Sequence, residues 1–379
     1  MGGVLMAWGA EGSAVAAVDS FEDYFAEYAA IRQRVGVLHM PWRGLVKVTG
    51  ADAADLLHRM ITNEVNGLAK GKSNHALLLN TKGRIDADFV VMKLGDAVWL
   101  DAGKFNTAGL IDSLEKMVFV EEVVFENLSE AYEHFFVTGP GAAALMQKVL
   151  DKGDVAGLAE WDCVEAALCG GAACLIQRRD ETGALGFHLH VPSADAERVY
   201  DALLSEAGWE AHQERDAQWA EKRREGLRGR PIGWGAYNTA RIEAGTPLYM
   251  IDFGTDSLPG ETGILDEVIS FTKGCYLGQE IVARMQNLGH PKRMLVGLKF
   301  ETELIADAGN PVMETSEEGA EPKVIGGVTS STASPLRGNQ SIAFAVMKWG
   351  KHKAGEQVQA RTEDHVSAAT ISGLRMMDS

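Results

Sequence analysis

A change of pattern near Pro291 limits the folds that this chain can adopt. Before Pro291, strand-like apolar runs alternate with amphipathic helix patterns. After it, short β-rich runs are separated by Gly, Pro and Ser, and they lie at 294–300, 323–331, 342–348 and 357–361. Several short strands with turn residues between them indicate a small barrel or sandwich. The chain is therefore predicted to be an α+β protein that ends in a β-domain.

The first twenty residues predict an unstructured leader. They are rich in Ala, Gly and Val, and they carry Glu11 but no Lys or Arg, so the basic start of a secretory signal is missing. A helix is predicted over 20–35, with Ser20 as its cap and Asp23 in its first turn. We expect a cytoplasmic protein.

The overall charge argues against two classes of partner. The formal net charge is −17, which disfavours a phosphate backbone or an anionic membrane surface. No apolar run approaches the roughly 20 residues that span a bilayer. We therefore expect no nucleic-acid partner and no membrane partner.

A hairpin is predicted by an apolar run at 75–79, turn residues from Asn80, and an alternating run at 84–93. Alternation puts Asp86 and Asp88 on the face opposite the apolar residues. This face is either an exposed polar strand surface or part of a site, and the pattern alone leaves both open.

Metal-binding patterns are weak. Cys163, Cys169 and Cys174 are spaced C-x5-C-x4-C, without the C-x2-C element of common metal sites, and are expected to be small core residues. His188 and His190 share one face of a predicted strand, but two histidines alone make a poor site. We expect no bound metal.

The segment Lys273-Gly274-Cys275-Tyr276-Leu277-Gly278-Gln279-Glu280 has the strongest chemical signal. The stretch continues to Arg284, and the second half of 273–284 has a helix pattern, which puts Cys275 at or just before a helix amino terminus. The helix dipole and the nearby Lys273 would lower the pKa of the thiol. Cys275 is then a candidate nucleophile, redox group or metal ligand, and the alternative is a small buried cysteine.

Arg241 and Glu243 precede a predicted helix stop at Gly245. They are too close in sequence to form an i,i+4 pair on one helix face. A carboxylate that faces a pocket suits a guanidine-like edge such as that of a pterin. The alternative is two solvated charges at a helix end.

These segments resemble a known family. Lys273 to Glu280 resembles the signature of the YgfZ-type folate-binding proteins, which act in iron–sulfur cluster maintenance and are relatives of the glycine-cleavage aminomethyltransferases (T-proteins). Residues 241–245 resemble the Arg-x-Glu-Ala-Gly element of the superfamily, 80–91 its first hairpin, and 326–335 its carboxy-terminal barrel motif. The resemblance runs from about Tyr24 to the end.

The resemblance implies an α+β, three-domain aminomethyltransferase-like fold around a central folate channel, with a carboxy-terminal β-barrel. It also implies tetrahydrofolate, or a one-carbon derivative, as the ligand. The expected division is a leader at 1–20, a folate-binding first domain at 21–150 and 230–290, a second α+β domain at 151–229, and the barrel at 291–379.

The resemblance also implies site residues. Glu243 would bind the pterin edge, and Lys273 and Cys275 would be the functional pair of the YgfZ-type motif. The expected catalytic residues are Cys275, Lys273 and Asp88; the expected folate-binding residues are Glu243, Arg241, Asn80, Tyr276, Gln279 and Arg284.

Departures from the T-protein pattern favour the YgfZ-type interpretation. The paired aspartates of the first hairpin read Ala87-Asp88 here, and Cys275 and Gln279 stand where T-proteins usually have Asp and Arg. T-proteins also tend to have Arg-Asp where this chain has Tyr237-Asn238.

We therefore expect a tetrahydrofolate-binding protein that assists iron–sulfur cluster assembly or repair, with iron–sulfur proteins as partners. The first alternative is a folate-dependent aminomethyltransferase or demethylase, in which Asp88 or Asp86 orients the amine or assists proton transfer. The second is a scaffold that only docks partner proteins.

Overall fold

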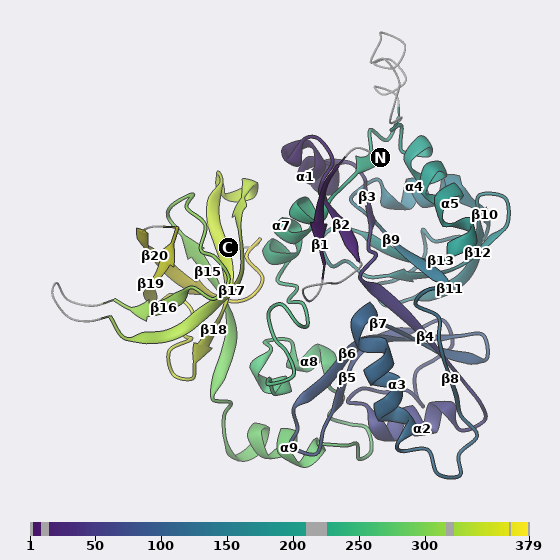
Figure 1. Cartoon of the computed structure of the whole chain (residues 1–379), viewed down its shortest axis with the longest axis horizontal. Helices are drawn as coiled ribbons and strands as arrows, with labels where there is room; N and C mark the ends of the chain where they lie inside the picture. The colour runs from purple at the N-terminus through teal and green to yellow at the C-terminus, as the bar shows by residue number, and fades with distance from the viewer. Residues whose placement is uncertain (1–2, 9–14, 210–225, 316–321, 364, 378–379) are drawn as a thin grey trace, which may run out of the picture. The chain divides into compact units, whose positions relative to one another are not determined.

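The computed structural model describes residues 3–8, 15–209, 226–315, 322–363 and 365–377. The chain forms two compact units (Figure 1). The first consists of Met1–Ala76 and Ala87–Tyr237, and the second of Leu77–Asp86 and Asn238–Ser379. The predicted α+β protein with a carboxy-terminal β-barrel is confirmed.

A seven-stranded sheet forms one layer of the first unit. Its order is β10 (Leu150–Lys152), β11 (Cys163–Leu168), β12 (Ala172–Arg178), β13 (Gly186–Pro192), β9 (Tyr132–Thr138), β3 (Gly36–His39) and β14 (Arg230–Pro231). Only β14 pairs in parallel with its neighbour. Helices α4 (Ala142–Val149) and α5 (Ser193–Glu206) lie beside it (Figure 1), and their apolar faces share its core.

A five-stranded sheet follows the order β5 (Ser73–Leu79), β6 (Ile85–Leu94), β7 (Ala97–Gly103), β4 (Arg43–Thr49) and β8 (Val124–Asn127). The helices near it in the chain are α2 (Ala53–Met60), the 3-10 turn η1 (Lys104–Asn106) and α3 (Thr107–Glu115). The predicted hairpin is β5–β6. Its alternation is confirmed, because Ile85 and Ala87 are buried whereas Asp86 is exposed and Asp88 is half-buried.

The amino-terminal residues differ from the prediction. The described part of 1–20 contains the antiparallel strands β1 (Val4–Ala7) and β2 (Ala16–Ser20), so it is not an unstructured leader. Helix α1 (Tyr24–Gln33) is capped by Asp23, whose carboxylate accepts a hydrogen bond from Ala26 N at 3.1 Å. Ser20 cannot be the cap because it pairs in β2.

The second unit contains a closed barrel in the order β15 (Arg293–Phe300), β18 (Gln340–Lys348), β17 (Val324–Ser334), β16 (Pro311–Glu314), β19 (Gln357–Thr362) and β20 (His365–Ser372). Its other elements are α8 (Leu265–Val268), α9 (Gln279–Leu288), η2 (Pro259–Glu261) and η3 (Pro335–Arg337). Helix α7 (Trp234–Ala244) runs from the first unit into the second and is followed by Gly245 at φ +87°, the predicted stop.

The division of the chain also differs from the expected one. A boundary was expected at 150/151, but β13 pairs with β9, and β9 pairs with β3. These hydrogen-bonded ladders put strands from both sides of that boundary into one sheet, and α4 and α5 share one core. A domain boundary is not expected at a position that so many backbone hydrogen bonds cross.

None of the helices in the described ranges is both long and apolar enough to cross a membrane.

Candidate functional site

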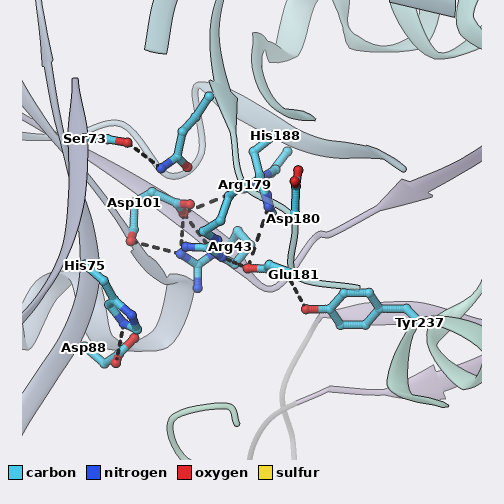
Figure 2. A network of polar contacts seen from close by, with 12 residues as sticks. Arg43, Ser73, His75, Asp88, Asp101, Arg179, Asp180, Glu181, His188 and Tyr237 are labelled. Atoms are coloured by element: carbon cyan, nitrogen blue, oxygen red, sulfur yellow. Dashed lines mark hydrogen bonds and ion pairs between the residues drawn. The ribbon is translucent and has the colours of Figure 1, made fainter. Parts of the chain in front are cut away.

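A buried polar network in the first unit begins with Arg43 and Asp101 (Figure 2). Arg43 is on β4 and Asp101 on the neighbouring strand β7. The guanidinium donates from Nε to Asp101 Oδ1 at 2.8 Å, and its Nη2 lies 2.7 Å from the same oxygen. The carboxylate has no exposed surface. A buried charge of this kind is tolerated only with a partner, and Arg43 is that partner.

A second carboxylate in the network is Glu181, in the turn between β12 and β13. It accepts a hydrogen bond from the Tyr237 hydroxyl at 2.7 Å and forms an ion pair with Arg179. His188 Nε2 lies 3.7 Å from Glu181 Oε1. These contacts fix the carboxylate on several sides.

Three buried histidines complete the network. His134 on β9 faces His190 on β13 in the strand register, and His134 Nε2 lies 2.9 Å from His188 Nδ1. Burial lowers the pKa of His190 to about 4. Burial also puts the pKa values of His134 and His188 well below the ordinary range, with further lowering by Arg43 and Arg179. All three imidazoles are therefore neutral near pH 7.

Asp88 is the expected catalytic residue in this unit. Its Oδ2 lies 2.8 Å from His75 Nε2, across the β5–β6 hairpin. The Asp88 side chain keeps 13% of its surface exposed and the His75 side chain 12%, so the pair is largely buried but still accessible to solvent. A carboxylate held by an imidazole can orient an amine or take part in proton transfer.

Asn80 lies at the tip of the same hairpin, where it shapes the turn. Its side-chain amide donates to Asp86 Oδ1 at 2.8 Å, and its carbonyl oxygen accepts from Lys82 N and Arg84 N. Such a set of local bonds is typical of a turn asparagine. The side chain is thus engaged within the hairpin.

Lys273, Cys275 and Tyr276 lie in an irregular segment of the second unit. Cys275 is exposed, whereas Lys273 is 9% exposed and holds its Nζ 5.3 Å from the centre of the Tyr276 ring. Burial raises the pKa of Tyr276 to about 12.

Helix α9 begins at Gln279, in the half of 273–284 where the sequence pattern predicted a helix. Its N-cap is Gly278, in the left-handed conformation, so Cys275 lies just before the first turn, which is one of the two predicted positions. The dipole effect fades beyond the terminal turn. Gln279 is half-buried and Arg284 is exposed on this helix.

Arg241 is fully buried in the second unit. Its Nη1 lies 2.7 Å from Asp252 Oδ2, its Nε donates to Asn238 Oδ1 at 3.0 Å, and its Nη1 donates to the Thr246 carbonyl at 3.1 Å. Asp252 in turn accepts hydrogen bonds from Thr329 and Ser330. This geometry ties the end of α7 to the barrel.

Glu243 is also buried, at 2% exposure, and lines a small cavity of about 190 Å³. Its Oε1 accepts a hydrogen bond from the Ser334 hydroxyl. The cavity is lined by Glu243, Ser334, Leu336, Arg337, Gln340, Met376 and Met377. Arg241 and Glu243 therefore have different surroundings, although they are two residues apart.

Sequence reasoning missed most of the buried network. Arg43, Asp101 and His134 were not selected, because each looks like an ordinary polar residue in a strand. The available signal was His134 in a predicted strand, but its pairing with His190 follows only from strand order. The three cysteines expected in the core are free, with Cys163 and Cys174 buried and Cys169 half-buried.

Comparisons with known proteins agree over most of the chain. Residues 15–273 match the model of the GCVT N-terminal domain, and 293–378 match the glycine cleavage T-protein C-terminal barrel domain. A protein named aminomethyltransferase from Streptomyces avermitilis is 31% identical over 323 residues, covering 84% of this chain and 80% of that protein.

A solved structure shows the same fold. The crystal structure of the glycine cleavage system aminomethyltransferase T from Bartonella henselae superimposes with a TM-score of 0.83 at 21% identity, covering 99% of this chain and 94% of that one. The two family models together leave little of the chain unmatched. The protein therefore belongs to the aminomethyltransferase (glycine cleavage T-protein) family.

Proposed function

We propose that this protein binds tetrahydrofolate and transfers a one-carbon unit to it. Membership of the aminomethyltransferase family and the relative from Streptomyces avermitilis support this function. The observation that carries it is the pairing of Asp88 with His75 at 2.8 Å, which holds a partly accessible carboxylate in a fixed position. One-carbon transfer to tetrahydrofolate thus replaces our first expectation, iron–sulfur cluster maintenance, as the leading function.

In this proposal Asp88 orients the donor amine or assists a proton transfer, and His75 positions Asp88. Donors of the right chemistry are an aminomethyl carrier or a methylated amine. Holding the donor carbon against the folate nitrogen converts a bimolecular step into a nearly unimolecular one, which supplies much of the rate. One well-placed carboxylate is consistent with such a reaction, even though Ala87 stands where the family has a second aspartate.

Glu243 is the best candidate for the pterin edge. Its two oxygens match the paired donors of a pterin amide and amino group. The adjacent cavity of about 190 Å³ is smaller than a typical ligand pocket, so it suits one end of a folate and not the whole molecule. Tyr276, Gln279 and Arg284 stay proposed contacts, whereas Arg241 and Asn80 are engaged in internal hydrogen bonds.

The test compares two aspartates on the same strand. Tetrahydrofolate binding and one-carbon transfer from aminomethyl and methylated-amine donors are measured for the wild type, Asp88→Asn and Asp86→Asn. We expect Asp88→Asn to bind folate normally and to lose about 10²–10⁴-fold in turnover, the usual contribution of a general acid or base. Asp86 is exposed, so Asp86→Asn serves as the control, and this variant should keep the turnover of the wild type. A wild type that binds no tetrahydrofolate would overturn the proposal.

A second candidate function, iron–sulfur cluster maintenance, is favoured by Cys275. It is the exposed cysteine of the four, and Lys273 lies two residues away. An accessible thiol could accept a one-carbon adduct, hold a metal or sulfur species transiently, or exchange with another thiol. The YgfZ-type resemblance of this segment points to the same role.

A cell-based comparison separates the two functions. Cells that lack the protein are complemented with wild type, Cys275→Ser, Cys169→Ser or Asp88→Asn, and the activities of their iron–sulfur enzymes are measured. Iron–sulfur maintenance predicts that Cys275→Ser fails while Cys169→Ser succeeds. If Cys275→Ser complements fully, this second function is wrong.

A further inference from the structure

Asp101, His134 and His190 bring three metal-ligating atoms together in the first unit. One atom from each side chain lies within 4.8 Å of the other two. His134 Nδ1 is 3.7 Å from Asp101 Oδ1, and His190 Nε2 is 3.9 Å from Asp101 Oδ2. The exposed fractions of the three residues are 0%, 3% and 2%, so bulk water does not reach them.

The facing atoms of this triad are unsatisfied. Asp101 Oδ2, His134 Nδ1 and His190 Nε2 have no hydrogen-bond partner within the described residues. Buried polar atoms are nearly always paired, and each unpaired one calls for an explanation. Three such atoms that converge on one point are the pattern expected around a bound ion.

We propose that Asp101, His134 and His190 bind a divalent transition-metal ion, with Zn²⁺ as the best match to their donor atoms. Zn²⁺ takes imidazole nitrogen and carboxylate oxygen at about 2.0–2.2 Å, so tetrahedral ligand atoms lie roughly 3.3–3.5 Å apart, and with three protein ligands a water molecule would take the fourth position. The distance of 3.9 Å between His190 Nε2 and Asp101 Oδ2 needs only a small side-chain rotation to reach this value, and all three ligand atoms already lie within 4.8 Å of one another.

Hydrogen bonds from neighbouring residues orient the side chains of the triad for metal binding. Arg43 bonds to Asp101 Oδ1, which leaves Oδ2 available to a metal. His134 Nε2 contacts His188 Nδ1, and when His134 donates this bond its Nδ1 carries a lone pair. Metal-bound histidines commonly donate their other N–H to a neighbouring acceptor, which fixes the tautomer.

The donor atoms of the triad select the kind of metal. Two of the three are imidazole nitrogens and one is a carboxylate oxygen. Mg²⁺ and Ca²⁺ prefer all-oxygen sites with several carboxylates. Imidazole donors favour Zn²⁺ and similar ions instead.

The position of the triad indicates a structural role for the ion. Asp101 belongs to β7 of the five-stranded sheet, whereas His134 and His190 belong to β9 and β13 of the seven-stranded sheet. An ion bound by all three would join the two sheets within one unit. We therefore expect metal binding to stabilise the first unit.

The test uses the tag-free full chain after dialysis against a chelator. Zn²⁺ is titrated by calorimetry and bound metal is measured by mass spectrometry. We expect about one Zn²⁺ per chain, a higher melting temperature with Zn²⁺, and loss of binding in His134→Ala and His190→Ala. The matched control is His39→Ala, at a half-exposed histidine on β3, which should bind Zn²⁺ like the wild type.

Co²⁺ provides a second measurement that does not depend on the variants folding. Wild type loaded with Co²⁺ should show the absorption of a tetrahedral site without a thiolate charge-transfer band, and Cys275→Ser should give the same spectrum. A thiolate band, or a wild type that binds no stoichiometric Zn²⁺, would overturn the proposal. Retained binding in folded His134→Ala and His190→Ala would do the same.

Discussion

Arg241 and Asp252 form an ion pair with an Nη1–Oδ2 distance of 2.7 Å, and neither side chain has any exposed surface. Removal of one partner leaves the other charge buried without compensation, which typically costs about 3–5 kcal/mol. We predict that Arg241→Met lowers the free energy of unfolding by this amount, measured by denaturant titration.

Two variants sharpen this prediction. Arg241→Met combined with Asp252→Asn should be more stable than Arg241→Met alone, since no charge is then stranded. Lys70→Met breaks the exposed Lys70–Asp96 pair and should change stability by less than about 1 kcal/mol. Equal losses for Lys70→Met and Arg241→Met would contradict the structural assignment of Arg241.

Gly245 should tolerate no side chain. Its φ is +87°, and an added Cβ would lie 2.7 Å from Arg375 N, a backbone atom. Gly338 has φ +65° with no atom near its added Cβ, so Gly338→Ala measures the conformational cost alone, about 1–2 kcal/mol. We predict a clearly larger loss for Gly245→Ala in thermal or denaturant unfolding. Equal losses of stability for Gly245→Ala and Gly338→Ala would mean that the backbone around Gly245 can shift to make room for the added Cβ.

Local patterns predicted much of the fold. The alternation after Asn80 and the stop at Gly245 depend on side-chain period and turn chemistry, which neighbouring residues carry. Four barrel strands were predicted near their observed bounds. Strands β16 and β20 were missed because they are short or carry a weak apolar pattern. The cap of α1 moved to Asp23 because Ser20 pairs in a strand.

The candidate sites depended on contacts that sequence spacing does not encode. Asp101 meets His190 because strands of two different sheets pack together. Arg241 was predicted to bind the ligand, because its ion-pair partner, Asp252, lies beyond the end of helix α7 and the pairing cannot be recognised from sequence spacing. The helix pattern after Cys275 predicted α9, which starts at Gln279, but the sequence left open whether Cys275 is exposed or buried.

Thiol accessibility gives a third prediction. At neutral pH a thiol reagent should modify Cys275 rapidly in the native protein. Cys163 and Cys174 should be protected, because burial raises the pKa of each to about 12 and keeps the reactive thiolate scarce. Cys275→Ser should remove the fast phase and Cys169→Ser should leave it. All four cysteines should react after unfolding, and a fast phase in Cys275→Ser would contradict the prediction.

Glu27 gives a pH-dependent prediction. Its carboxylate accepts hydrogen bonds from Phe21 N and Gly233 N at 2.8 and 2.7 Å, yet burial raises its pKa. A raised carboxyl pKa contributes stability at low pH that is lost as pH rises through the folded-state value. The stability of wild type relative to Glu27→Gln should therefore fall as the pH rises above about 4, the ordinary carboxyl value.

Chemical denaturation across this pH range is the measurement. Glu27→Ala should be less stable than Glu27→Gln by about 1–3 kcal/mol, because the backbone N–H groups lose their acceptor. A wild-type advantage that grows with pH would show that the hydrogen bonds of the carboxylate outweigh its burial.

The pairing of His75 with Asp88 makes a prediction about catalysis that follows from the proposed transferase function. His75→Phe removes the ring nitrogen that holds Asp88 Oδ2 at 2.8 Å, so the carboxylate should lose its fixed orientation. We predict that kcat falls on the order of 10- to 100-fold while KM changes little, since misplacement of a reacting group affects the chemical step.

Two further variants distinguish positioning from general damage to the fold. His75→Gln keeps a side-chain N–H that can reach Asp88, so it should recover part of the lost kcat. His58 forms a similar pair with Glu64 at 2.9 Å in the same unit, and His58→Phe should leave kcat unchanged. If His58→Phe and His75→Phe lose equal activity, or if His75→Phe retains full kcat, then His75 does not position a catalytic carboxylate.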